Sequence, residues 1–180
     1  MVPLKDAIAE KHRQAEQMVF NQKMFAGEIT DEQYATYLQQ LRQIFGTLEL
    51  YMLPNIHLYR SAALFDDVRE LSKEKIPTLQ STQYYINYLR PLTDVERLPH
   101  IYLHYLALLY GGQMMKNKVP GSGRLYEFKN PRECIESIRE LQDDSWADEA
   151  NKGLDYFMDI LDELQHIFKL TRREVSSAHS

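Results

Sequence analysis

The chain has 180 residues and a formal net charge of −5, with 21 lysines and arginines against 26 aspartates and glutamates. That length suits one domain with a single core, and the negative charge argues against a nucleic-acid-binding protein. One cysteine, Cys134, excludes a disulfide framework and a thiolate metal cluster. No apolar run approaches the roughly 18 residues of a membrane span, and the N-terminal segment is too charged for a signal peptide. We therefore expect a soluble, cytoplasmic protein without a nucleic-acid or membrane partner.

The first segment, from Leu4 to Val19, has apolar residues three and four positions apart and is predicted to be a helix. His12 lies on the apolar face of this helix, with Lys5 two turns before it and Glu16 one turn after it. A histidine in such a position is more often a core residue bonded to a carbonyl than a ligand. A carboxylate one turn away can also fix the imidazole tautomer for metal ligation, so both readings stay open.

The same apolar spacing predicts helices along most of the remaining chain. Thr30 and Gln33 form a capping-box pattern at the start of a helix that runs to Tyr51. Asp94 is the expected N-cap of a later helix. Further helices are expected over residues 60–71, 81–90, 131–142 and 146–170, the last with Ser145 as its cap.

The segment from Leu103 to Lys118 is predicted to be helical although Gly111 and Gly112 lie in its middle. Two adjacent glycines in a helix interior cost about 1 kcal/mol each relative to alanine. One explanation is a kink or close packing against another helix. The other is that a flat ligand lies against the bare backbone, which only glycine allows to come so close.

No stretch alternates like a strand, no repeat is visible and no linker divides the chain. We therefore expect an all-α, single-domain helical bundle of six to eight helices over residues 1–170, with residues 171–180 as a frayed tail.

Most enzyme motifs are missing, including GxGxxG, the P-loop, GxSxG, HExxH and the paired Glu-x-x-His of di-iron proteins. What remains is one histidine on an apolar helix face and one glycine pair on a distant helix. If they faced each other across a slot, they would hold a flat iron macrocycle between an imidazole and bare backbone.

Five segments of the chain resemble the heme oxygenase family, in the same order and over about the first 165 residues. They are Leu4–Glu16, Gly27–Glu49, Tyr59–Leu64, Tyr105–Gln113 and Asp148–Leu164. The resemblance implies that heme is both substrate and cofactor and is cleaved to biliverdin with release of iron and carbon monoxide. It also implies an electron donor such as ferredoxin or a reductase.

On one side of the heme, the resemblance implies His12 as the axial iron ligand, supported by Glu16. It assigns Lys5 to a heme propionate and Tyr102 to the neighbourhood of the propionates. Arg139 is our candidate for a further cation at that edge. Basic residues are also what two carboxylates at a pocket rim require.

On the other side, Gly111 and Gly112 match the glycines whose backbone lies over the heme. Ala107 stands where many members have glycine, and Leu108 stands where many have an aspartate that organises the proton-delivering water. His104 stands where several members have arginine. Because Leu108 removes the polar group, we expect the remaining water acceptors to come from elsewhere in the pocket.

Two other functions fit parts of the pattern. A heme-binding or heme-sequestering protein would use His12 and never open the ring, and Leu108 favours it. Another enzyme on the same helical fold, such as a thiaminase-like or di-iron oxidase relative, would need a nucleophilic cysteine or a histidine–carboxylate cage. A basic patch of Lys11, Arg13, Lys116 and Lys118 would suit an acidic electron donor, or these side chains are merely solvated.

Overall fold

The computed structural model describes residues 1–172, which form nine α-helices and three short 3-10 helices and contain no strand. The all-α, single-domain class is confirmed, but the expected six to eight helices are too few. The tail expected over 171–180 lies outside the described residues from 173 onward. The α-helices are α1 (Leu4–Ala7), α2 (Ala9–Glu16), α3 (Val19–Phe25), α4 (Asp31–Leu48), α5 (Ser61–Leu71), α6 (Gln80–Leu89), α7 (Asp94–Lys116), α8 (Pro131–Arg139) and α9 (Ala147–Ile167).

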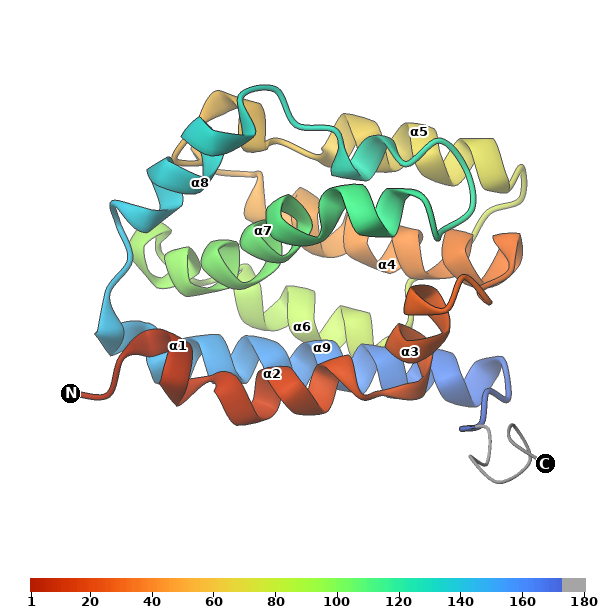
Figure 1. Cartoon of the computed structure of the whole chain (residues 1–180), viewed down its shortest axis with the longest axis horizontal. Helices are drawn as coiled ribbons and strands as arrows, with labels where there is room; N and C mark the ends of the chain where they lie inside the picture. Colours follow the sequence, from red (N-terminus) through yellow and green to blue (C-terminus); the bar gives the residue numbers. More distant parts are fainter. Residues whose placement is uncertain (173–180) are drawn as a thin grey trace.

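The helices gather around α9, against which α2, α3, α4, α6 and α7 all pack. In Figure 1, α1 and α2 run along α9 at one side of the molecule, α7 and α4 cross the middle, and α5 lies at the other side. The side chains of Leu4, Leu38, Leu161 and Leu164 are fully buried. Burial of such a side chain stabilises a fold by about 1.5–3 kcal/mol, so the first and last helices are joined in one core. Across the described residues, no helix is both long enough and apolar enough to cross a membrane.

The single helix expected from Leu4 to Val19 is wrong, because the chain is interrupted at Ile8 and again at Gln17 and Met18. Met18 is extended, with φ −64° and ψ 145°. The side-chain amides of Asn21 and Gln22 donate to the carbonyls of Ala15 and Glu16. These side chains satisfy carbonyl groups at the end of α2, which lets the helix stop and turn into α3.

The expected capping box at the start of α4 is confirmed, because Gln33 N donates to Thr30 Oγ1 and Thr30 N donates to Gln33 Oε1. The cap expected at Asp94 is wrong by one residue. Thr93 caps α7 instead, in a second capping box with Glu96. The sequence contains the pattern Thr-x-x-Glu that identifies this cap.

The cap expected at Ser145 is also wrong. The backbone N–H of Ser145 donates to Asp143 Oδ1 at 2.8 Å, so Asp143 caps the 3-10 helix η3 (Asp144–Trp146). The helix α9 starts only at Ala147. An aspartate oxygen that binds the backbone two residues on is a common turn device.

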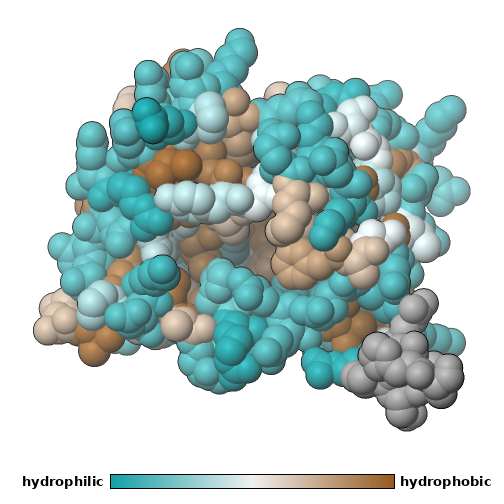
Figure 2. All heavy atoms as spheres, in the orientation of Figure 1, coloured by the Kyte–Doolittle hydropathy of each residue, from teal (hydrophilic) through white to brown (hydrophobic). Residues whose placement is uncertain are grey.

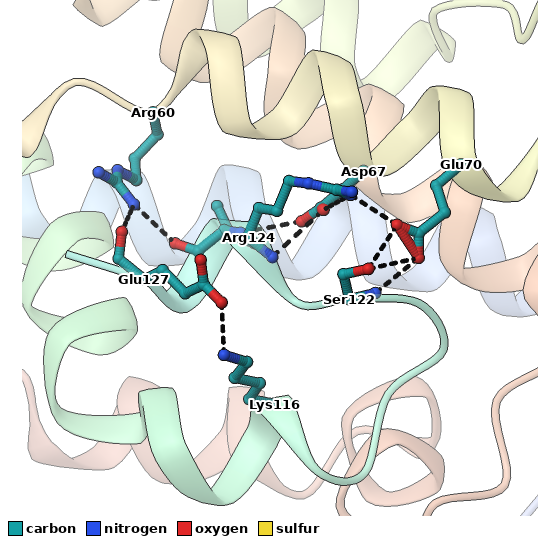
Figure 3. Close-up of polar contacts among 8 residues, drawn as sticks. Arg60, Asp67, Glu70, Lys116, Ser122, Arg124 and Glu127 are labelled. Carbon is teal, nitrogen blue, oxygen red and sulfur yellow. Dashed lines mark hydrogen bonds and ion pairs between the residues drawn. The ribbon is translucent and has the colours of Figure 1, made fainter.

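The loop after α7 contains the 3-10 helix η2 (Arg124–Tyr126) and is fastened to α5. Figure 3 shows the Arg124 side chain reaching both Asp67 and Glu70, at 3.2 and 2.5 Å. Asp67 is buried and also accepts from the backbone N–H groups of Arg124 and Leu125. These contacts fix η2 to α5, and η2 also packs against α7.

Candidate active site

A cavity of about 670 Å³ opens between α2 and α7. It is also lined from α1, α3, α4, α8 and α9, so residues from both ends of the chain meet there. Figure 2 shows this face of the molecule hollowed near its middle, with hydrophobic atoms inside and hydrophilic atoms around the opening. Small-molecule sites typically have volumes of about 300–1,000 Å³ and mostly apolar walls. The cavity is therefore large enough for one cofactor-sized molecule.

His12 lines the cavity from α2, with Glu16 beside it one turn further along. Nδ1 of His12 lies 3.2 Å from Oε1 of Glu16, and the two side chains are 49% and 55% exposed. A carboxylate beside Nδ1 favours the tautomer with its proton there, which leaves the lone pair of Nε2 available to a metal. The geometry does not support a core histidine bonded to a carbonyl.

The opposite lining comes from one face of α7, where His104, Ala107, Leu108 and Gly111 follow one another at helical spacing. Leu108 is buried and lines the cavity, so no side-chain polar group stands at that position. Ala107, Leu108 and Gly111 have no polar side-chain atom, and the Tyr110 hydroxyl is bonded to Arg139 at the rim. His104 is the polar member of the set.

The two adjacent glycines of α7 have different surroundings. A Cβ atom at Gly111 would meet nothing closer than Cγ of Met115 at 3.8 Å, so its bare backbone faces the cavity. A Cβ atom at Gly112 would lie 3.4 Å from the carbonyl oxygen of Tyr126 and 3.5 Å from its Cβ. Gly112 therefore packs against η2 and does not line the cavity, in contrast to the expected position of its backbone over a heme. Close packing therefore accounts for Gly112, whereas Gly111 places bare backbone at the cavity wall.

Cationic and aromatic side chains stand together at the rim of the cavity. The Arg139 guanidinium donates to the Tyr110 hydroxyl at 3.2 Å, and its central carbon lies 6.0 Å from the centre of the Tyr102 ring. The Tyr110 hydroxyl raises the pKa of Arg139 above its usual value. Lys5 lines the same cavity and has no ion pair within residues 1–172. This rim suits a ligand with carboxylates at one edge.

The family model described as heme oxygenase matches residues 2–163. The chain belongs to the heme oxygenase family. Bovine (Bos taurus) heme oxygenase 1 is 31% identical over 147 residues, which are 67% of this chain and 50% of that protein. Mouse (Mus musculus) heme oxygenase 2 is 25% identical over an alignment that covers 95% of this chain and 67% of that protein. This member of the heme oxygenase family thus spans half the length of the bovine relative.

The fold of solved heme oxygenases agrees with that of this family member. Heme oxygenase-1 of Synechocystis sp. PCC6803, solved in complex with heme, has a TM-score of 0.79 at 19% identity and covers 91% of this chain and 90% of its own. The enzyme of Leptospira interrogans has a TM-score of 0.77 at 21% identity and covers 89% of this chain and 97% of its own. At such identities the likeness establishes the fold.

Of the nine site residues predicted for this heme oxygenase family member, all except Gly112 line one cavity. These eight are Lys5, His12, Glu16, Tyr102, Ala107, Leu108, Gly111 and Arg139. The sequence analysis did not identify Tyr85, whose hydroxyl contacts both His100 and His104. The four-residue spacing of the two histidines, which places them on one face of α7, is the sequence pattern that indicates this cluster.

The expected basic patch is largely neutralised in the structure. Three of its four side chains are paired with carboxylates: Lys11 with Asp155 at 2.6 Å, Arg13 with Glu10 at 2.5 Å and Lys116 with Glu127 at 2.5 Å. Exposed ion pairs of this kind are ordinary features of solvated helices. The geometry therefore favours the solvated reading over a free docking surface for an acidic partner.

Proposed function

We propose that this chain binds one heme in the cavity between α2 and α7 and cleaves its ring to biliverdin, iron and carbon monoxide. The observation that carries this proposal is that His12 and Gly111 line the same cavity from different helices. A planar ring between them has an imidazole on one face and backbone without a side chain on the other. Heme is both substrate and cofactor, because its own iron supplies the dioxygen chemistry that opens the ring.

The residues present fit such a group. His12 has one nitrogen beside a carboxylate and the other free, as a single axial ligand requires. A Cβ at Gly111 would face the cavity without a clash, since the nearest side-chain atom, Cγ of Met115, lies 3.8 Å from its position. Lys5 and Arg139 supply two positive charges at the rim for two propionates.

The other predicted residues have positioning roles in this proposal. Glu16 holds the tautomer and the ring plane of His12. Tyr102 and Arg139 form one edge of the rim and, with Lys5, fix the rotation of the ring. Ala107 and Leu108 form the apolar part of the α7 wall and limit the space above the ring.

The proposed reaction also needs an electron donor such as ferredoxin or a reductase. The ion pairs of Lys11 and Lys116 argue against a docking site made of those side chains. A cytoplasmic setting is proposed because Cys134 is the chain's single cysteine and is buried.

The alternative function, heme sequestration without ring cleavage, is favoured by the apolar side chain of Leu108. One experiment separates the possibilities. Addition of hemin and then ascorbate is expected to give a Soret band that bleaches while red absorption appears. A stable Soret band would support the sequestering protein, and no Soret band would contradict heme binding altogether.

A further inference from the structure

A chain of hydrogen bonds runs from the cavity wall to the molecular surface between α6, α7 and α9. Nε2 of His104 lies 2.8 Å from the Tyr85 hydroxyl, which lies 2.7 Å from Nδ1 of His100. Nε2 of His100 lies 2.9 Å from Oε1 of Glu149. His104 lines the cavity, Tyr85 and His100 are fully buried, and the Glu149 side chain is 25% exposed.

The proton positions along this chain follow from the groups themselves. An ionised carboxylate only accepts, so His100 must hold its proton on Nε2 opposite Glu149. Nδ1 of the neutral His100 then accepts from Tyr85, whose single hydroxyl hydrogen is thereby used. The Tyr85 oxygen must in turn accept from Nε2–H of His104. His104 therefore keeps the lone pair of Nδ1, which has no hydrogen-bond partner within residues 1–172.

The charge states agree with this order. Burial raises the pKa of Glu149, but hydrogen bonds from Tyr88 and His100 outweigh it and hold that pKa below its usual value. Burial lowers the pKa of His104 to about 3, so its imidazole is neutral. Lys152 Nζ, 4.0 Å from the other Glu149 oxygen, is the charged group nearest the surface end.

The relay is tightly held by its surroundings. A Cβ atom at Gly153 of α9 would lie 2.9 Å from Nδ1 of His100 and 3.2 Å from the Tyr85 hydroxyl, so a side chain there would displace the hydrogen-bonded atoms. The Tyr156 ring stacks on Tyr85 at a centroid distance of 5.0 Å and an angle of 8°. A buried polar network fixed in this way is preorganised.

We propose that His104 exchanges protons with the cavity and that Tyr85, His100 and Glu149 form a relay that connects it to solvent. The proposal rests on the proposed function, because reduction of dioxygen during ring opening consumes protons inside the cavity. With every donor turned toward the cavity, one proton leaves Nδ1 of His104 and each group takes a proton from the next. Glu149, which is ionised at rest, first takes a proton from solvent, passes it to Nε2 of His100 and is then ionised again. The relay resets when both imidazoles change tautomer and the Tyr85 hydroxyl turns.

This relay adds a hydrogen-bond acceptor beside the apolar part of the α7 wall. Ala107, Leu108 and Gly111 offer no side-chain acceptor, whereas Nδ1 of His104 offers one on the same face of the helix. The carboxylate that sets this acceptor lies three hydrogen bonds away, at Glu149. Tyr85, His100 and Glu149 therefore act through His104 and are positioning residues.

The first test uses the ligand-free full chain and reads the imidazole tautomers by nitrogen-15 NMR. Wild type is expected to show His104 with its proton on Nε2 and a bare Nδ1. Tyr85→Phe breaks the relay and should shift the tautomer ratio of His104 at least about tenfold toward Nδ1–H. The matched control is Tyr84→Phe, which removes an exposed hydroxyl from the neighbouring residue of α6 and leaves the relay intact. A proton on Nδ1 in wild type, or no change in Tyr85→Phe, would overturn the relay.

The second test follows ring opening in the heme complex. Tyr85→Phe should slow it about a hundredfold, the usual range for loss of a proton-transfer group, while hemin affinity changes less than about twofold. Tyr84→Phe should match wild type. If Tyr85→Phe fails to fold, Glu149→Leu at the partly exposed end carries the same two predictions. A wild type that leaves the ring intact would contradict the proposed function, whereas the NMR comparison, made without heme, decides the relay by itself.

Discussion

His12 and His104 are both imidazoles of the cavity, and their surroundings differ in the way their proposed roles require. His12 is half exposed and lies beside a carboxylate, so one ring nitrogen is directed by Glu16 and the other is free to ligate. His104 is buried between the rings of Phe45 and Phe157 and bonded to Tyr85. Burial keeps His104 neutral, so its free Nδ1 lone pair can accept a hydrogen bond from water in the cavity.

Replacement of His12 tests the ligand assignment. His12→Ala is expected to retain hemin, because the apolar walls and the rim cations remain, but with a shifted Soret band. Added imidazole should fill the vacated space and partly restore the spectrum. Absorption titration with hemin measures both effects, and His166→Ala, an exposed histidine of α9, is the control. An unchanged spectrum in His12→Ala would place the ligand elsewhere.

The buried neutral state of His104 also predicts a pH dependence of stability. Its folded pKa of about 3 lies below the unfolded value of 6.5, so between these values the unfolded chain binds more protons and stability falls as pH falls. From pH 7 to pH 5 the contribution of His104 should decrease by about 2 kcal/mol. His104→Gln should lose that part of the dependence in urea unfolding, whereas His166→Gln should keep it. Equal pH slopes in wild type and His104→Gln would contradict the assignment.

The α7 helix combines two requirements in adjacent residues, since Gly111 faces the cavity and Gly112 faces η2. Helical continuity through both glycines shows that neither is needed for a break in the helix. The site therefore depends on the absence of a side chain at one position and on close packing at the next.

Alanine at the two positions should separate these requirements. Gly111→Ala should raise the free energy of unfolding by up to about 1 kcal/mol through helix propensity, because its Cβ meets no close atom. It should weaken hemin binding several-fold, because the methyl group enters the cavity. Gly112→Ala should leave hemin affinity unchanged and gain less stability, since its Cβ lies 3.4 Å from the Tyr126 carbonyl. Thermal unfolding and hemin titration measure both, and equal loss of affinity in the two variants would contradict the placement.

The contacts between α5 and η2 hold in place the segment against which Gly112 packs. Asp67 is at the centre of these contacts (Figure 3). Asp67→Ala should cost about 2–3 kcal/mol of unfolding free energy, since it leaves the buried N–H of Leu125 without a partner. The exposed neighbour Asp66→Ala is the matched control and should change stability by less than about 0.5 kcal/mol. Chemical denaturation measures the unfolding free energy of both variants. Equal values would show that the contacts of Asp67 with η2 do not stabilise the fold.

Sequence patterns predicted the features that depend on local spacing. The periodicity of α4, the Thr30 capping box and the shared helix of His12 and Glu16 all follow from residues three or four apart. The interruption at Met18 depends on side chains of α3 that reach back to α2 carbonyls, and the position of Gly112 depends on η2. The relay joins three helices. These features come from contacts between distant segments, which periodicity along one segment cannot reveal.

The cavity is lined by α1 and α2 from one end of the chain, α7 from the middle and α9 from near the other end. Both α2 and α7 pack against α9 (Figure 1). Because no single segment contains the site, heme binding requires the folded molecule and should stabilise it by linkage. The same assembly separates the proposed ligand, on α2, from the proposed proton path, which reaches the cavity through α7.

The most direct measurement is a single turnover of the one-to-one hemin complex. The complex is reduced under oxygen with a ferredoxin system, and the pigment is then extracted and separated by chromatography. We expect heme to disappear and biliverdin, with one carbon monoxide per heme, to take its place. Recovery of intact heme from a reduced and oxygenated complex would contradict ring cleavage and leave a heme-binding protein.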